Sequence, residues 1–154
     1  IDLVARNSER PRIITQYIQS ELKQNLGLNV QIQLFDHKVY RSQITTQNIP
    51  MMLQVWAADY PDGDSFVGLF ESNTGNNLTK YANPKVDENI VKAREEWNTL
   101  KREKLYREAQ NLIQVQDAVI LPLYYEENEA LVAKNVKGFS INPIGYYFLK
   151  DVNL

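Results

Sequence analysis

The densest group of side chains that could carry out chemistry in this sequence is a set of three aspartates, Asp59, Asp62 and Asp64. A calcium-binding loop would require oxygen ligands at alternate positions and a glutamate at the twelfth. Counted from Asp59, the third position is Pro61 and the twelfth is Phe70, so the spacing excludes such a loop. A carboxylate-dependent hydrolase would require two carboxylates held apart around a pocket, and no further feature of the sequence supports it.

The position of Asp59 separates it from the other two aspartates. It follows an apolar run, residues 51–56, that predicts a strand buried on both faces. Ligands of open α/β sheets bind just outside the carboxyl ends of the strands, so Asp59 is placed to meet a cationic group. For Asp62 and Asp64, a solvated turn with Asp64 as the N-cap of a short helix is an equally good interpretation.

The remaining reactive residues form no comparable group. His37 is the only histidine and the sequence has no cysteine, which argues against a zinc or nickel site. The serines lie in no Gly-x-Ser-x-Gly elbow, and no glycine-rich phosphate loop is present. We therefore expect no catalytic residue, no metal and no cofactor.

Length and charge narrow the class of protein further. The 154 residues, 44% hydrophobic and 23% charged, are sufficient for one domain with a sizeable core. A net charge of −2 gives no reason to expect nucleic acid as a partner. The apolar runs are too short to span a bilayer. Because the sequence opens at Ile1 in a strand-like pattern, without a methionine or a signal peptide, we expect an excised fragment.

Hydrophobic periodicity in the first half predicts strands and helices in the order β-α-β-α-β, which is typical of a parallel α/β sheet. Ser8 and Asp36 are candidate N-caps of the two helices, and Gly27 is a suitable residue to end the first. The predicted strands are residues 1–6, 28–35 and 51–56. The predicted inward face of the first helix is Ile13, Ile14, Tyr17, Ile18, Leu22 and Leu26.

The second half is predicted to be mainly helical at first. A polar loop over residues 71–80 precedes a helix that starts at Asn83-Pro84 and directs Trp97 inward, and another helix starts at Thr99. Residues 119–125 predict a strand at a sheet edge or with a bulge, because Pro122 cannot donate to a central ladder. Weaker strand candidates are residues 131–133 and 146–149.

The segment V-W-A-A-D-Y-P-D, residues 55–62, resembles the W-x-A-D-Y-P-D-P-x-x-F motif of the family 5 extracellular solute-binding proteins. These are the oligopeptide- and dipeptide-binding components of ABC importers. Further segments match the family in order: residues 77–87, the helix of residues 102–116, L-P-L-Y-Y at 121–125 and V-K-G-F at 136–139. The sequence departs from the family at Gly63, where proline is usual, and at Glu126, where peptide binders often have an aromatic residue.

This resemblance implies an α/β fold, the second-lobe part of a type II periplasmic-binding-protein fold, with a mixed sheet flanked by helices. Residues 1–129 would belong to the second ligand-binding lobe, and residues 130–154 would return to the first lobe. The implied protein works outside the cytoplasm, in the periplasm or on the outer face of the cell membrane, held there by a lipid anchor. It would bind peptides without catalysis and deliver them to ABC transporter permease subunits.

The resemblance also implies a set of ligand-binding residues. In peptide-binding members the motif aspartate forms a salt bridge with the ligand's α-amino group, a role that falls on Asp59 here. The backbone around the preceding tryptophan pairs with the extended peptide. Trp56 could instead be a core aromatic residue, and Asn77 could instead be a turn-forming asparagine. Asn76 is the alternative to Asn77 as the ligand-contacting asparagine, through a shift of one residue. The implied ligand-binding residues are Val55, Trp56, Ala57, Asp59, Asn77 and Tyr125.

Two other functions fit parts of the sequence. A ligand-sensing domain of a transcription regulator could share this domain type, and a helix-turn-helix upstream in the parent gene would favour it. A small carboxylate-dependent hydrolase would show turnover without a cofactor. The ligand also remains open, because relatives carry sugars, haem and metal chelates as well as peptides.

Overall fold

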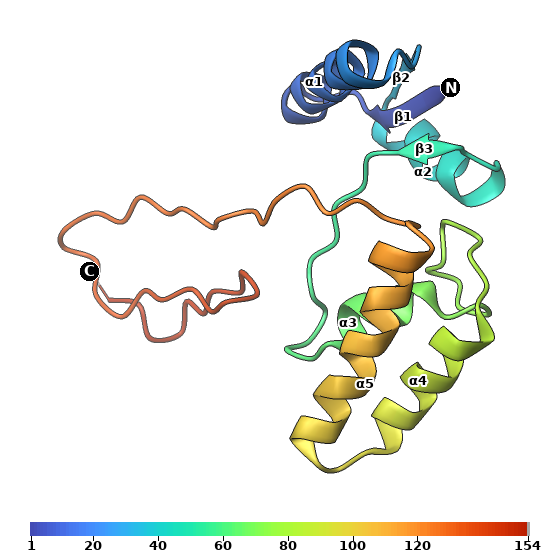
Figure 1. Ribbon diagram of the computed structural model, residues 1–154. Coiled ribbons are helices and arrows are strands. Elements are labelled where there is room, and N and C mark those ends of the chain that lie inside the picture. Colours follow the sequence, from blue (N-terminus) through green and yellow to red (C-terminus); the bar gives the residue numbers. More distant parts are fainter. Residues whose placement is uncertain (154) are drawn as a thin grey trace. The chain divides into compact units, whose positions relative to one another are not determined.

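Strand β1 (Asp2–Arg6) is the central strand of a three-stranded sheet with the order β2-β1-β3. The computed structural model describes residues 1–153. Strands β2 (Gln31–Phe35) and β3 (Met51–Met52) both run parallel to β1, which places Leu3 between Ile32 and Met51. The three segments predicted as strands therefore lie in one sheet, and the predicted parallel pairing is confirmed (Figure 1).

Both faces of β1 are covered, because Leu3, Val4 and Ala5 point alternately to opposite faces and all three are buried. Helix α1 (Glu9–Leu26) and helix α2 (His37–Thr46) each contact β1 and β2. Val4 packs in one cluster with Tyr40 and Ile44 of α2. This cluster is the core under one face of the sheet.

The first two helices begin and end largely as predicted. Gly27 adopts a left-handed conformation (φ 67°) and donates its N–H to the carbonyl of Lys23, which ends α1. Asp36 caps α2, since its Oδ1 accepts from the N–H groups of Lys38 and Val39 at 2.9 and 3.1 Å. Ser8 occupies the N-cap position of α1, but its side chain makes no capping hydrogen bond.

The predicted inward face of α1 is partly wrong. Ile13, Tyr17 and Leu26 are exposed, whereas Thr15 is fully buried. Burial of this threonine is possible because its hydroxyl donates within the helix, to the carbonyls of Pro11 and Arg12. Hydrophobicity alone could not reveal that a satisfied hydroxyl faces the sheet.

Strand β3 is much shorter than the predicted strand over residues 51–56. After Met52 only the N–H of Leu53 continues the pairing, by donating to the carbonyl of Val4 at 2.9 Å. The Leu53 carbonyl accepts instead from the Tyr40 hydroxyl at 2.7 Å. This side-chain bond takes the place of a ladder bond, and the chain leaves the sheet. Val55 is 59% exposed, so the prediction of burial on both faces is wrong here.

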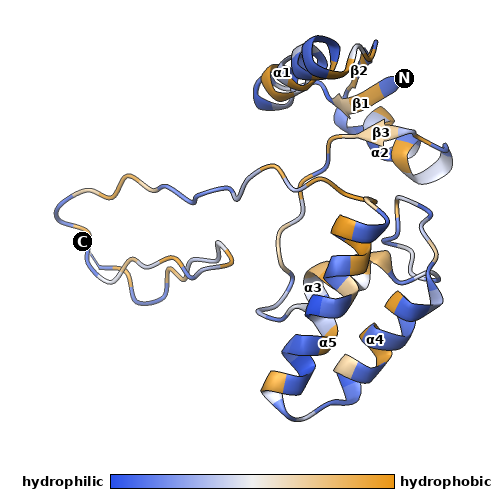
Figure 2. Ribbon diagram, viewed as in Figure 1, coloured by the Kyte–Doolittle hydropathy of each residue, from blue (hydrophilic) through white to orange (hydrophobic). Residues whose placement is uncertain are grey.

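The later helices agree with the predicted positions. They are α3 (Asp64–Val67), the 3-10 turn η1 (Gly68–Phe70), α4 (Pro84–Glu95), α5 (Thr99–Asn111) and the π-helical turn η2 (Leu112–Gln116). Helices α4 and α5 are mainly hydrophilic, with apolar residues interspersed (Figure 2). Gly63, not Asp64, is the N-cap of α3. Trp97 follows the end of α4 and is 98% exposed, so its predicted inward position is wrong.

Residues 119–125 form no strand, and neither do residues 131–133 or 146–149. Within the described residues these segments find no partner strand. Two isolated antiparallel bridges, Ile141 to Tyr147 and Lys137 to Asn153, are the only pairing in the tail that the structure describes. The edge strand predicted around Pro122 is therefore wrong for this chain. None of the helices over residues 1–153 is long and apolar enough to cross a membrane.

Two compact units alternate along the chain. The first comprises Ile1–Trp56 with Leu69–Glu88, and the second comprises Ala57–Gly68 with Asn89–Leu154. The segment with the three aspartates thus belongs to the same unit as α5. The expected boundary at residue 130 concerns the lobes of a longer protein and stays a prediction.

Candidate ligand-binding site

The loop of residues 59–64, which we call the aspartate loop, lies between the end of β3 and helix α3. Its first residue is fixed through the backbone, because the Asp59 N–H donates to Oγ of Ser65 at 2.8 Å. Ser65 is buried in α3. Within the loop, the Asp62 N–H donates to the Tyr60 carbonyl, and the Ser65 N–H donates to the Asp62 carbonyl. The loop is therefore a folded turn and not an extended linker.

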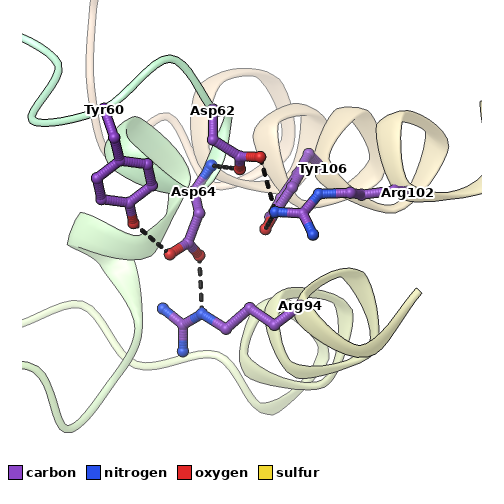
Figure 3. A network of polar contacts seen from close by, with 6 residues as sticks. All are labelled: Tyr60, Asp62, Asp64, Arg94, Arg102 and Tyr106. Atoms are coloured by element: carbon purple, nitrogen blue, oxygen red, sulfur yellow. Dashed lines mark hydrogen bonds and ion pairs between the residues drawn. The ribbon is translucent and has the colours of Figure 1, made fainter. Parts of the chain in front are cut away.

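Asp62 is held by its two carboxylate oxygens. Its Oδ1 accepts from the Asp64 N–H at 2.9 Å, and its Oδ2 accepts from Nη2 of Arg102 at 2.7 Å (Figure 3). The same Nη2 donates to the Tyr106 hydroxyl at 3.3 Å, and the guanidinium lies 5.3 Å from the centre of the Tyr106 ring. Arg102 and Tyr106 lie one turn apart on α5, so this helix supplies a prepared partner for Asp62.

Asp64 is also held through both oxygens. Its Oδ1 accepts from Nε of Arg94 on α4 at 2.8 Å, and its Oδ2 accepts from the Tyr60 hydroxyl at 2.7 Å (Figure 3). The Asp64 side chain is only 14% exposed. A carboxylate at that depth requires such partners, and the first turn of α3 adds favourable N–H groups.

These contacts shift the pKa values of the groups involved. Burial would raise the pKa of Asp62, but the Arg102 hydrogen bond, the Asp64 N–H and the charge of Arg102 together lower it. Burial, followed by the charge of Asp64, raises the pKa of Tyr106 to about 12. The hydrogen bond to Asp64 raises the pKa of Tyr60. Near neutral pH Asp62 is thus charged and both tyrosines are neutral.

Asp59 differs from its two neighbours. Its side chain is exposed, and its carboxylate makes no hydrogen bond or ion pair with any residue in the range 1–153. Asp62 and Asp64 are paired with arginines from two helices. Their structural role agrees with the turn interpretation, and Asp59 is the carboxylate left available to a ligand.

The backbone before Asp59 is also available. Val55, Trp56 and Ala57 take part in no backbone–backbone hydrogen bond within the described part of the chain. Val55 and Ala57 are exposed, while Trp56 is partly buried, with its Nε1 buried and unpartnered among residues 1–153. Free N–H and carbonyl groups in an extended segment are what an added strand requires.

The Asn77 side chain is engaged in hydrogen bonds within its own loop. It is buried, its Nδ2 donates to the carbonyls of Tyr81 (2.7 Å) and Glu71 (3.3 Å), and its Oδ1 accepts from the Thr79 hydroxyl (2.8 Å). Its geometry matches the alternative of a turn-forming asparagine, and Asn76 is exposed beside it. Tyr125 lies in the second unit, 97% exposed and outside any regular element.

The residues that sequence reasoning missed are Ser65, Arg94, Arg102 and Tyr106. The i, i+4 spacing of Arg102 and Tyr106 is a signal, but it also suits an ordinary helix surface. The aspartates that pair with Arg94 and Arg102 lie 30 and 40 residues earlier in the sequence, at a separation where periodicity carries no information.

Comparison with known proteins shows the family to which this chain belongs. Residues 1–78 match the family described as bacterial extracellular solute-binding proteins, family 5 Middle. This chain belongs to that family. The periplasmic murein peptide-binding protein MppA of Escherichia coli K12 is 30% identical over 142 residues, which is 92% of this chain and 26% of that protein. The dipeptide-binding protein DppE of Bacillus subtilis 168 is 29% identical over 137 residues, 89% of this chain and 25% of that protein.

The fold is shared with solved structures of type II periplasmic binding proteins. The structure of Haemophilus influenzae OppA in complex with the peptide RPPGFSPFR superimposes with a TM-score of 0.87 at 25% identity, covering 98% of this chain and 30% of that one. The chain spans about a quarter of the length of the curated relatives that it matches. The expected fold class and the family resemblance are confirmed.

Proposed function

We propose that the protein carrying this chain binds peptides outside the cytoplasm and delivers them to an ABC importer. The observation that supports this most directly is the unpartnered Asp59 carboxylate in a loop whose other two carboxylates are held by arginines. The similar proteins are murein peptide-, dipeptide- and oligopeptide-binding proteins, which supports the same ligand class.

In this proposal the peptide's α-ammonium group meets Asp59. A buried ammonium needs a compensating carboxylate, and a charge-assisted hydrogen bond is shorter and stronger than a neutral one. The peptide backbone pairs with the free groups of Val55, Trp56 and Ala57, which gives affinity without reading side chains. Trp56 forms a wall of the site. No observation favours a hydrolase, because Asp62 and Asp64 are already engaged.

The remaining parts of the proposal concern the longer protein. Residues 1–129 contribute to the second lobe and residues 130–154 return to the first, so that the two lobes close around the ligand. Tyr125 contacts the ligand near this return, and Asn77 contributes by holding its loop in shape. The partners are the permease subunits of the transporter. A lipid anchor holds the full-length protein on the outer face of the cell membrane.

The test is calorimetric titration of the full-length protein with free-amino peptides of two to nine residues, and with N-acetylated forms of those that bind. Asp59→Asn should weaken binding of free-amino peptides by about 2–5 kcal/mol, as expected when one partner of a buried charge pair is removed. Acetylation should cause a similar loss in the wild type. Glu103→Gln, which removes an exposed charge on α5, is the matched control. Less than a threefold effect of both Asp59→Asn and acetylation would reject Asp59 as the anchor.

A further inference from the structure

The aspartate loop is tied to two different helices by two separate ion pairs. Asp64 is bound by Arg94 of α4, and Asp62 is bound by Arg102 of α5 (Figure 3). Gly63 lies between the two paired aspartates. Ser65, the residue after Asp64, accepts the Asp59 N–H through its hydroxyl oxygen and so fixes the start of the loop. Every residue that anchors the loop therefore lies within the second unit.

Two glycines give the ion pairs their space. A Cβ at Gly68 would lie 3.1 Å from Nη2 of Arg94 and 3.2 Å from Oδ1 of Asp64. A Cβ at Gly63 would lie 3.2 Å from Cδ2 of Tyr106, the ring that supports Arg102. All three distances are tighter than ordinary van der Waals contact, so a side chain at Gly68 would crowd the Arg94–Asp64 pair and one at Gly63 would crowd the Tyr106 ring.

The two ties also sort the charges of the loop. Three carboxylates stand within six residues, and without compensation they would repel one another and offer a diffuse negative patch. Arg94 compensates the charge of Asp64 and Arg102 that of Asp62, each in an ion pair that is also a hydrogen bond. Within residues 1–153 neither arginine pairs with Asp59, so the uncompensated negative charge of the loop is concentrated on that one residue.

We propose that Arg94 and Arg102 are positioning residues for ligand recognition: by anchoring Asp64 and Asp62 they hold Asp59 in place and leave its carboxylate as the one charge available to the ligand's amine. This inference rests on the proposed function for its ligand, but the anchoring of the loop can be measured without any ligand. An amine is recognised well only if the carboxylate is held before the ligand arrives, because ordering it afterwards costs affinity.

The first measurement is hydrogen exchange of the Asp59 amide in the ligand-free chain, followed by NMR. Arg102→Met should accelerate this exchange at least about tenfold, because the bond to Ser65 opens more often when the loop loses its tie. Arg107→Met is the matched control: Arg107 is also on α5 and also paired, with Glu103 at 2.6 Å, but it does not touch the loop. Unchanged exchange at Asp59 in a folded Arg102→Met variant would overturn the proposal.

The second measurement is the ratio of dissociation constants for N-acetylated and free-amino forms of the tightest peptide found above. This ratio does not depend on the folded fraction, so it separates a positioning role from mere loss of stability. Loss of one partner of a buried charge pair, about 2–5 kcal/mol, corresponds to about thirtyfold to several thousandfold in that ratio. Arg102→Met should remove most of it, Arg102→Lys should restore part, and Arg107→Met should leave it unchanged.

The outcomes separate the two proposals. A wild-type ratio near one would reject Asp59 as the amine anchor and with it the role of the arginines in recognition. A large wild-type ratio that persists in Arg102→Met and in Arg94→Met would overturn the positioning role alone. If Arg102→Met does not fold, Arg102→Lys and Gly68→Ala, which crowds the Arg94 pair, provide the same comparison with smaller changes.

Discussion

Arg102 and Asp62 stand forty residues apart in the sequence, yet Nη2 of the arginine donates to Oδ2 of the aspartate at 2.7 Å. This pair joins helix α5 to the loop that follows the sheet's shortest strand. Each side chain is 29% exposed, which places the pair between a surface salt bridge and a buried one. Its contribution to stability should therefore be measurable and dependent on pH.

Asp62→Asn should lower the free energy of unfolding by about 1 kcal/mol at pH 7, because it removes the ion pair but keeps an acceptor for the Asp64 N–H. The pKa of Asp62 is lowered in the folded chain. Its stabilisation is therefore present above the unfolded pKa near 4 and is lost as the pH falls through the lower folded value. Urea unfolding of both proteins at pH 7 and pH 2.5 checks this. A gap that stays constant between the two pH values would contradict it.

Tyr106→Phe tests how the stability of the chain depends on pH above 10. The folded chain keeps the Tyr106 proton up to a pKa of about 12, whereas the unfolded chain loses it near 10. Stability of the wild type should fall as the pH rises from 10 to 12, by at most about 1.4 kcal/mol per pH unit from this group. The phenylalanine variant should show a shallower decline in urea unfolding over the same range. Tyr125→Phe, whose tyrosine is fully exposed, is the control and should follow the wild type.

Gly63 permits a comparison of two substitutions. Its φ of −60° is compatible with proline, the residue usual in the family, but any Cβ there meets the Tyr106 ring at 3.2 Å. Gly63→Ala should destabilise the chain by about 1 kcal/mol, because the ring is buried and fixed. Gly63→Pro should be more stable than Gly63→Ala by about 0.5 kcal/mol, since it restricts the unfolded chain. Equal stabilities in chemical denaturation would show that backbone restriction contributes nothing here.

Trp97→Gln should leave the stability of the chain unchanged within about 0.5 kcal/mol, because the indole is 98% exposed. Trp56 is the only other tryptophan, and it is partly buried. The variant's fluorescence should therefore be shifted to shorter wavelength and be less sensitive to iodide than that of the wild type. Iodide quenching that is equal in the two proteins would show that Trp97 is shielded.

Sequence reasoning succeeded where short-range rules decide the structure. The Asp36 cap, the left-handed Gly27 and the parallel order of β1, β2 and β3 depend on local chemistry or on periodicity. It overestimated β3, because the Tyr40 hydroxyl takes the carbonyl that would have continued the ladder. A competing bond from a helix thirteen residues away cannot be seen in a strand pattern.

The candidate site was predictable in part. Asp59 follows the sheet as expected from its position after an apolar run. Its position after the strand distinguished it in the sequence, but the pairing of Asp62 with Arg102 and of Asp64 with Arg94 could not be predicted there. The tail around Tyr125 was predicted wrongly. Its apolar, β-forming residues stay irregular and exposed, because they pair with no strand within residues 1–153.

The alternation of the two units also determines the order in which the site is made. During synthesis Arg94 follows its partner Asp64 only after thirty residues, and Arg102 follows its partner Asp62 only after forty. The nascent loop therefore carries three mutually repelling charges until both later helices exist. We expect pulse-labelled refolding to show protection of β1 amides before that of Asp59. Asp59 thus becomes the one uncompensated carboxylate of the loop only after α4 and α5 have formed and paired with Asp64 and Asp62.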